Sequence, residues 1–289
     1  MTYGEQKIKE EEARREVIAQ VHEQFPNVTF PEPTKEPLFF GKLKRDPVPG
    51  NFVTVDANTK TPWAVVTDEY QIIHHEEIIG KVLSLVKEIP EYGQPEFNIH
   101  LMQNGAKMNL TVQFPEHSIE VRKGDAFNPN IQFRNSYDAK WRFGYKFGAF
   151  RLVCSNGMIA GVIQNSMKAR HLQSLDFESV ILDHLKSGMV SFSEQNELWK
   201  KWAEKQIEIA QFEKISEVAG FSPVEVEKLK NLNIIGDDVT VDVLLQENRL
   251  TAWDAHNAMT QFATHEVRSE LRKLDLPVSI SNSFSSVLQ

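Results

Sequence analysis

A chain of 289 residues with 41% hydrophobic and 25% charged residues has an ordinary globular composition, and its length suits one large domain or two smaller ones. It contains no apolar run of the roughly 20 residues that a membrane helix needs, and its polar N-terminus does not resemble a secretory signal, so we expect a cytoplasmic protein. The single cysteine, Cys154, excludes an internal disulfide and a multi-cysteine metal site, and the net charge of -8 argues against a general nucleic-acid binder.

The first 50 residues predict an arm. Residues 6–24 are typical of a charged helix whose only apolar stripe is Val17, Ile18 and Val21, which favours an arm or an oligomer contact over a core position. Six prolines follow between residues 26 and 49. They exclude a regular helix and indicate a linker or a wrapping segment.

A hairpin and a helix come next. Residues 52–73 carry β-branched and aromatic residues around a turn from Asp56 to Pro62, which predicts a β-hairpin. Residues 74–89 have helical spacing and end before Pro90. His74 and His75 lie beside Glu76 and Glu77, but adjacent helical residues point in different directions, so a solvated helix start is favoured over a metal site.

From Asn98 to Met158 the hydrophobic period is two, which predicts a β-meander. The strands are expected at 108–114, around Ile119 and Val121, around Ile131 and Phe133, and at 141–154. In the last strand the apolar residues change from odd to even positions between Phe147 and Phe150, which indicates a β-bulge near Gly148. The aromatic residues of this strand then lie on the core face.

Positive charge is concentrated in the same region of the sequence. Residues 121–170 contain nine basic and two acidic residues, a charge of +7, which leaves -15 for the remainder. With the bulge, Arg142, Lys146 and Arg151 lie on the face opposite the aromatic residues. The candidate nucleic-acid-binding residues are Arg134, Lys140, Arg142, Lys146, Arg151, Lys168 and Arg170. Charge balance with acidic neighbours in the fold is the alternative explanation of this basic segment.

The C-terminal half predicts helices. Residues 171–213 have a helical pattern interrupted around Gly188. Ser222 caps a second helix, with Pro223 at its first position and Glu225 three residues after the cap, and Thr251 caps a third helix over 251–267. The tail from Ile280 to Gln289 is expected to be flexible or docked as a strand.

The sequence lacks the motifs of common enzymes. It has no phosphate loop, no dinucleotide fingerprint and no nucleophile elbow. Cys154 falls on the expected core face, and His256 and His265 are nine residues apart on one helix. We therefore predict no catalytic residue, no cofactor and no metal; an enzyme would require Cys154, His171, His256 or His265 to meet in space.

Three stretches resemble one family. FGAFRLVCSNGMIAG (147–161), TPWAVVTDEYQII (61–73) and LTAWDAHNAMTQFATHE (250–266) are similar to the phage/plasmid-like domain of unknown function that occurs in bacteriophages, plasmids and their hosts. The resemblance spans about residues 50 to 280. It implies a mobile-element protein in a bacterial host cell and brings no known activity or catalytic residues.

The order of elements also resembles a second group. A hairpin, a helix, an antiparallel meander and a further helix are similar to the core of single-strand annealing proteins, in which a basic groove holds the DNA backbone and subunits assemble side by side. This likeness of fold order implies a homo-oligomer that binds single-stranded nucleic acid.

We therefore expect an α+β fold, with an antiparallel β-meander, a preceding hairpin-helix unit and a helical C-terminal half. The expected division is an N-terminal helix and proline-rich arm (1–50) and an α+β domain (51–289), with the sheet core at about 51–165 and the helical part at about 166–289. The expected function is noncatalytic phage-type nucleic-acid binding, for annealing or protection in recombination. The alternative is a protein-interaction module that binds a host protein.

Overall fold

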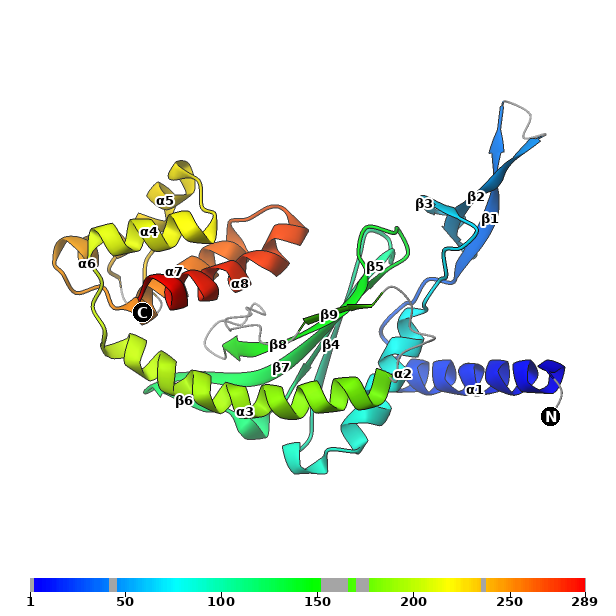
Figure 1. Cartoon of the computed structure of the whole chain (residues 1–289), viewed down its shortest axis with the longest axis horizontal. Helices are drawn as coiled ribbons and strands as arrows, with labels where there is room; N and C mark the ends of the chain where they lie inside the picture. Colours follow the sequence, from blue (N-terminus) through cyan, green and yellow to red (C-terminus); the bar gives the residue numbers. More distant parts are fainter. Residues whose placement is uncertain (1–2, 42–45, 152–165, 170–176, 235–237, 289) are drawn as a thin grey trace. The chain divides into compact units, whose positions relative to one another are not determined.

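A computed structural model describes residues 3–41, 46–151, 166–169, 177–234 and 238–288 of the chain. Helices and antiparallel strands both contribute large parts of the fold, which confirms the α+β class (Figure 1). Two compact units are present. The first comprises Met1–Val112, Ile131–Lys146 and Ser166–His184, and the second comprises Gln113–Asn130, Phe147–Asn165 and Leu185–Gln289.

The described strands form two sheets, one of three strands in the order β1-β2-β3 and one of six strands in the order β4-β5-β7-β8-β9, with β6 paired to β7. The strands of the first sheet are β1 (Pro33–Phe40), β2 (Asp46–Asp56) and β3 (Pro62–Thr67). Those of the second are β4 (Glu96–Met102), β5 (Lys107–Gln113), β6 (Ile119–Arg122), β7 (Asp125–Ser136), β8 (Phe143–Arg151) and β9 (Ser166–Ala169).

The helices occupy the two ends of the chain and the segment between the sheets. They are α1 (Tyr3–Gln24), α2 (His75–Lys87), α3 (Phe177–Glu204), α4 (Ile209–Ala219), α5 (Pro223–Lys230), α6 (Val241–Gln246), α7 (Ala252–His265) and α8 (Glu270–Val287). Short 3-10 turns lie at η1 (Pro90–Tyr92) and η2 (Pro115–His117). The predicted caps are confirmed, since Ser222 and Thr251 accept hydrogen bonds from the backbone N–H groups of Glu225 and Asp254.

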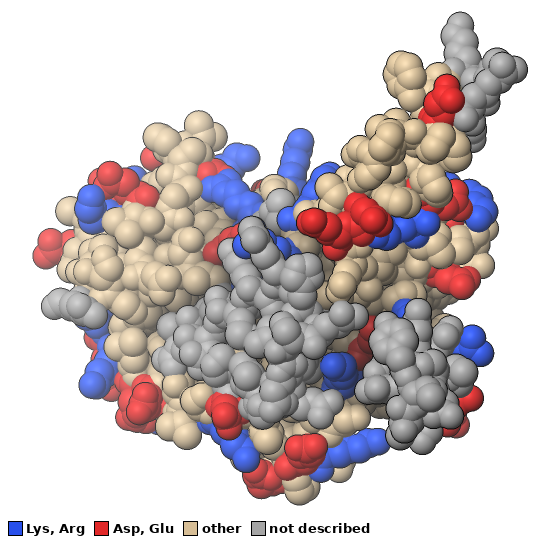
Figure 2. Space-filling model, turned by 45° about the vertical axis from the view of Figure 1, so that its right-hand side comes forward, with Lys and Arg blue, Asp and Glu red and all other residues tan. Residues whose placement is uncertain are grey.

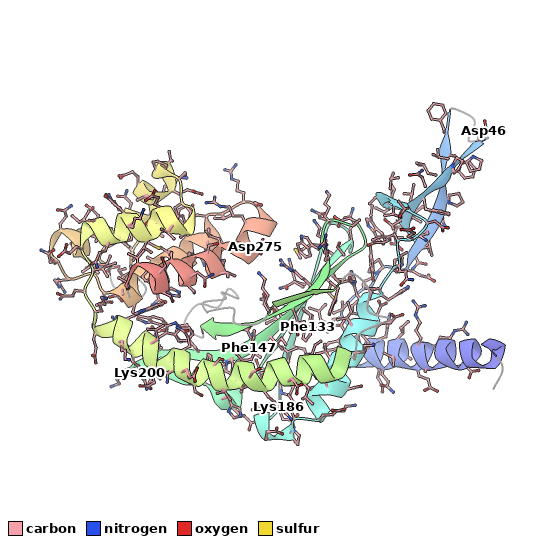
Figure 3. The ribbon with its side chains drawn as sticks, viewed as in Figure 1. Asp46, Phe133, Phe147, Lys186, Lys200 and Asp275 are labelled. Carbon is pink, nitrogen blue, oxygen red and sulfur yellow. The ribbon has the colours of Figure 1, made fainter. Side chains whose placement is uncertain are left out.

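The proline-rich segment that we interpreted as a linker contains β1 and the first half of β2. Proline cannot donate a ladder hydrogen bond, so strands that contain it lie at sheet edges. β1 is such an edge strand, and Pro47 and Pro49 lie in the part of β2 that extends beyond its pairing with β3. The two strands therefore continue as a ribbon whose far end is marked by Asp46 (Figure 3), and Phe40 on this ribbon is 80% exposed.

Helix α1 packs on α2 in the first unit. A Cβ placed on Gly80 of α2 would come 2.1 Å from Cγ1 of Val17, so the absence of a side chain lets the two helices approach closely. Val21, in the stripe predicted from the sequence, is completely buried. The stripe thus packs within the unit, against another helix.

The interruption predicted at Gly188 is wrong, because α3 runs without a break from Phe177 to Glu204. A Cβ on Gly188 would come 2.6 Å from the ring of Phe147. Glycine is therefore required here for close packing of a helix on an aromatic ring. Figure 3 marks Phe147 on β8.

The tail prediction is also wrong, since residues 280–287 belong to helix α8. The helix contains Pro277 and several serines, which are poor helix formers, and the sequence pattern is therefore weak. Leu276, Ile280 and Phe284 recur every four residues and are all buried. Burial of this stripe stabilises a helix that propensity alone does not predict.

Candidate nucleic-acid interface

The aromatic residues of the meander lie in the core, as the alternation predicted. Phe133, Phe143, Tyr145 and Phe147 are each at most 4% exposed. The ring centroids of Phe133 on β7 and Tyr145 on β8 lie 5.9 Å apart, so both rings lie on the same face of the sheet. Burial raises the pKa of Tyr145 to about 12. These rings are not available for stacking on bases.

The basic residues alternate with these rings and lie on the opposite face. Arg134 follows Phe133 on β7 and Lys146 follows Tyr145 on β8, and both are half-buried. Arg142, which directly precedes β8, is exposed. The same face carries polar neighbours, since Gln132 donates a hydrogen bond to the hydroxyl of Thr111 on β5 over 3.4 Å. We call Arg134, Lys140, Arg142 and Lys146 the basic face.

The turn between β7 and β8 is held by an ordered set of contacts. The Ser136 hydroxyl accepts a hydrogen bond from the Trp141 N–H and donates one to the Trp141 carbonyl, both over 3.0 Å. Asp138 accepts a hydrogen bond from the backbone N–H of Lys140 over 3.0 Å and forms a buried ion pair of 3.3 Å with Lys107. The exposed Lys140 and Arg142 therefore lie on a turn whose backbone is hydrogen-bonded to Ser136 and Asp138.

Strand β9 contains one of the predicted residues, Lys168, whose backbone pairs with Gly144 of β8. The side chain of Lys168 lies outside the described part. Arg151 is the last residue of β8, and its side chain lies outside the described part. Arg170, Cys154 and His171 also lie outside the described residues, as do the side chains on which the predicted bulge at Gly148 depends.

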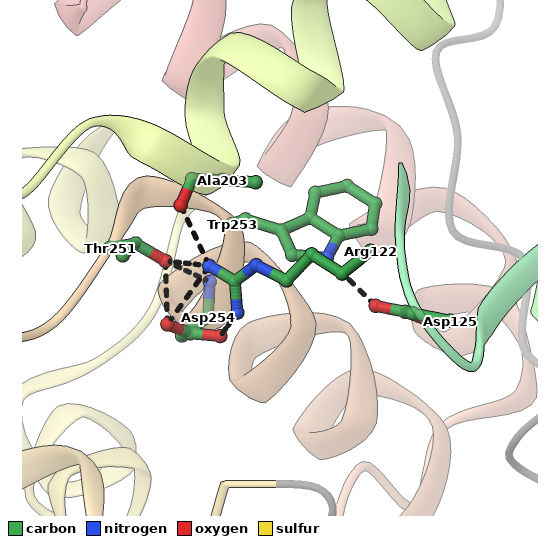
Figure 4. A network of polar contacts seen from close by, with 6 residues as sticks. All are labelled: Arg122, Asp125, Ala203, Thr251, Trp253 and Asp254. Carbon is green, nitrogen blue, oxygen red and sulfur yellow. Dashed lines mark hydrogen bonds and ion pairs between the residues drawn. The ribbon is translucent and has the colours of Figure 1, made fainter. Parts of the chain in front are cut away.

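The surface carries charges of both signs (Figure 2). On the face drawn in Figure 2, Lys and Arg are interspersed with Asp and Glu. Arg122 belongs to the basic segment of the sequence. In the second unit it forms an ion pair and hydrogen bonds with other residues of the fold (Figure 4). Its guanidinium donates to Asp254 over 2.6 Å, to the Thr251 hydroxyl over 2.7 Å and to the Ala203 carbonyl over 2.9 Å. Part of the +7 charge is therefore balanced within the fold.

The same network anchors helix α7 in the second unit. The indole N–H of Trp253 donates to Asp125 over 2.8 Å, and the Trp253 ring stacks on that of His256, with centroids 5.6 Å apart and an interplanar angle of 7°. His256 is completely buried and lies 3.1 Å from the Ser281 hydroxyl, whereas His265 is exposed. Within the described residues no group of three metal-ligating side chains converges.

The first unit contains a buried histidine that the sequence pattern did not indicate. His75 is completely buried, and the interpretation of a solvated helix start is therefore wrong. Its Nδ1 lies 3.1 Å from the Asn135 side-chain amide, its Nε2 lies 3.0 Å from the Gly105 carbonyl, and its ring stacks on Tyr137 at 4.0 Å. A carbonyl only accepts, so Nε2 carries the proton and Nδ1 accepts from the amide. Burial lowers the pKa of His75 to about 3.

The comparisons with known proteins identify one family. The family described as Domain of unknown function (DUF932) matches residues 62–283. The chain belongs to this family. The DUF932 match begins at the first residue of β3 and ends within α8. It therefore includes β3 but leaves out β2, the other strand of the hairpin. Neither a curated protein nor a solved structure matches the chain. Among its described helices, none is both long and apolar enough to span a membrane.

Proposed function

We propose that this DUF932 protein is a noncatalytic, phage-type protein that binds single-stranded nucleic acid by its phosphates and acts in annealing or protection during recombination. One observation carries the proposal: a hydrogen-bonded turn presents the exposed Lys140 and Arg142, and strand β8 continues from it with the half-buried Lys146 on the face opposite a buried aromatic core. Ammonium and guanidinium groups that follow one another along a surface form charge-assisted hydrogen bonds with successive phosphates of a nucleic-acid backbone. The acidic remainder of the chain disfavours nonspecific binding elsewhere.

The proposal predicts salt-dependent and sequence-independent affinity. Phosphate contacts release counterions, so the logarithm of the association constant falls linearly with the logarithm of salt concentration. Replacing Lys140 and Arg142 together by Ala should weaken binding about equally for all sequences and reduce the magnitude of the salt slope by roughly 1 to 2. Fluorescence anisotropy with labelled 30-mer oligonucleotides at several salt concentrations measures both quantities.

A charge-matched control separates this effect from net charge. The double variant Lys87→Ala and Lys228→Ala removes two exposed lysines from α2 and α5 and should bind as the parent does. No binding at micromolar protein in low salt would end the proposal. Equal losses in the two double variants would show that net charge, and no particular face, governs the interaction.

A second candidate is the protein-interaction module, such as a phage factor that binds a host protein. The exposed aromatic pair on the β1–β2 ribbon favours it, because Phe39 is 44% and Phe40 is 80% exposed. Large exposed apolar side chains at one place on a surface are typical of partner contacts. On this alternative, replacing both by Ser abolishes partner capture, whereas the Lys140 and Arg142 double variant retains it.

A further inference from the structure

A second charged site lies in the first unit and adjoins the sheet turn described above, since the hydroxyl of its lining residue Tyr70 donates to the Ser136 carbonyl over 3.0 Å. A cavity of about 800 Å³ opens between α1, β1 and the start of α2. We call it the α1–α2 pocket. It is lined by Arg14, Pro33, Thr34, Lys35, Tyr70, Gln71, Ile72, Ile73, His74, Glu77, Ile78 and Lys81.

The pocket carries a net positive charge in an acidic protein. Arg14, Lys35 and Lys81 contribute three positive charges, whereas Glu77 and the Lys35 partner Asp68, 3.8 Å from the ammonium, contribute two negative charges, which leaves +1 in a chain whose total is -8. The three cations come from three different elements, α1, β1 and α2. Like charges gathered in one cavity repel each other, so an anion that enters it gains favourable electrostatic energy.

Two of the three cations, Arg14 and Lys35, are held in place by neighbouring groups and keep solvent access. Arg14 forms an ion pair with Glu77, and its side chain is 40% exposed. The Lys35 ammonium donates to the Asp68 carbonyl over 2.6 Å and lies 5.0 Å from the centre of the Phe52 ring, with its side chain 24% exposed. These contacts orient the side chains before any ligand arrives, which lowers the entropic cost of binding.

The start of α2 contributes a neutral polar group. His74 occupies the N-cap position of α2, and its side chain makes no capping hydrogen bond. Burial, with a smaller effect of the Arg14 charge, lowers the pKa of His74 to about 4, so its imidazole is neutral near pH 7 and can donate a hydrogen bond. Pro33, Ile72 and Ile78 supply an apolar wall on which an organic group can pack.

We propose that the α1–α2 pocket binds a phosphate monoester, carried either by the end of a nucleic-acid strand or by a free mononucleotide. A phosphate monoester has a charge of about -2 above pH 6, and the three cations of the pocket attract it. The cavity of about 800 Å³ is larger than a phosphate group and accommodates the attached sugar and base. The strand-end form rests on the nucleic-acid binding proposed above; the mononucleotide form does not.

Isothermal titration calorimetry on the full chain tests this proposal with two pairs of ligands. One pair is an oligonucleotide with and without a 5′-phosphate, and the other is a nucleoside monophosphate and the matching nucleoside. The phosphorylated member of at least one pair should bind about tenfold more tightly, as expected for charge-assisted hydrogen bonds. A gain in both pairs assigns the site to mononucleotides, and a gain in the first pair alone assigns it to strand ends.

Variants locate the effect in the pocket. Lys81→Ala should reduce the preference for the phosphorylated ligand about tenfold, whereas Lys87→Ala, an exposed lysine farther along the same helix, should leave it unchanged. Glu77→Gln removes the competing carboxylate and should strengthen phosphate binding severalfold. A gain of affinity cannot arise from loss of folding, so this variant keeps the test decisive.

Two results would overturn the proposal. One is equal affinity for the phosphorylated and unphosphorylated members of both pairs. The other is a phosphate preference that Lys81→Ala and Glu77→Gln leave unchanged. If neither oligonucleotide binds, the proposed nucleic-acid function fails, and the mononucleotide pair alone still decides whether the pocket recognises a phosphate monoester.

Discussion

At the scale of single residues, His75 shows how tertiary contacts decide whether a polar side chain is buried or exposed. In the sequence it stands between another histidine and two glutamates, which is typical of a wet helix start. In the structure its ring stacks on Tyr137, and the Tyr137 hydroxyl accepts a hydrogen bond of 2.8 Å from the His75 backbone N–H. Both partners of the imidazole come from elsewhere in the chain, at Gly105 and Asn135.

This burial predicts that His75 makes the protein less stable in acid. The pKa of His75 is about 3 in the folded chain and 6.5 in the unfolded chain, so only the unfolded chain gains a proton at this site between these values. The contribution of His75 to the free energy of unfolding is complete above pH 6.5 and falls by up to about 1.4 kcal/mol per pH unit below it. Urea unfolding at pH 7, 6, 5 and 4 measures it.

A variant isolates this contribution from that of other groups. His74, whose pKa is lowered to about 4, changes stability in the same direction, whereas the buried Glu76, with a raised pKa, opposes it. The difference in unfolding free energy between the parent and His75→Gln should therefore shrink as pH falls from 7 to 4. A difference that stays constant over this range would contradict the buried neutral imidazole.

At the scale of elements, alternation and helix spacing predict which face of an element is buried. Phe143, Tyr145 and Phe147 of β8 and the even positions of β5 proved buried, and the four-residue stripe of α8 packs in the second unit. Gly188 is the exception, because glycine in a helical pattern usually indicates a break. Its role depends on Phe147, which is 41 residues earlier in the chain and carries no local signal.

The close contact at Gly188 predicts that adding one methyl group destabilises the protein. In an exposed helix, Gly→Ala stabilises by up to about 1 kcal/mol, but here the new Cβ would overlap the Phe147 ring at 2.6 Å. We expect Gly188→Ala to reduce the free energy of unfolding by about 1 to 3 kcal/mol. Chemical denaturation measures the change.

Two further variants test the cause of that loss. Ser193→Ala, at an exposed site on the same helix, should change stability by less than about 0.5 kcal/mol. Combining Gly188→Ala with Phe147→Leu should cost less than the sum of the two single changes, since the smaller side chain makes room for the methyl group. Strict additivity of the two changes would rule out the steric explanation.

At the scale of the whole molecule, the two compact units do not correspond to continuous stretches of sequence. Strands β7 and β8 and helix α3 each contribute residues to both units. The first unit depends on residues from 135 to 138 for its internal bonds: the Thr54 hydroxyl donates to the Tyr137 carbonyl over 2.8 Å, and Lys107 pairs with Asp138.

A fragment of residues 1–112 should therefore fail to fold. It would leave Lys107, which is 4% exposed in the full chain, without the Asp138 carboxylate, and it would expose the apolar face of β5. We expect a weak near-ultraviolet circular dichroism signal and rapid proteolysis, in contrast to the full chain. A cooperative thermal transition of the fragment would contradict this expectation.

The sequence by itself determined the class of the fold, the main secondary elements, the helix caps at Ser222 and Thr251 and the division of the meander into an aromatic and a basic face. These properties follow from local periodicity and from side chains within four residues of each other. It also indicated a domain of unknown function, through three short stretches that lie within or overlap the matched residues 62–283.

Only the tertiary structure decided how polar groups are used. Four features depend on residues at least 20 positions apart in the chain. They are the burial of His75, the ion pair of Arg122 with Asp254, the close packing at Gly188, and the pocket lined by Arg14, Lys35 and Lys81. A charge or an imidazole has the same sequence pattern whether it is buried or exposed. The long-range neighbour sets its solvation, and with it the chemistry that the residue can perform.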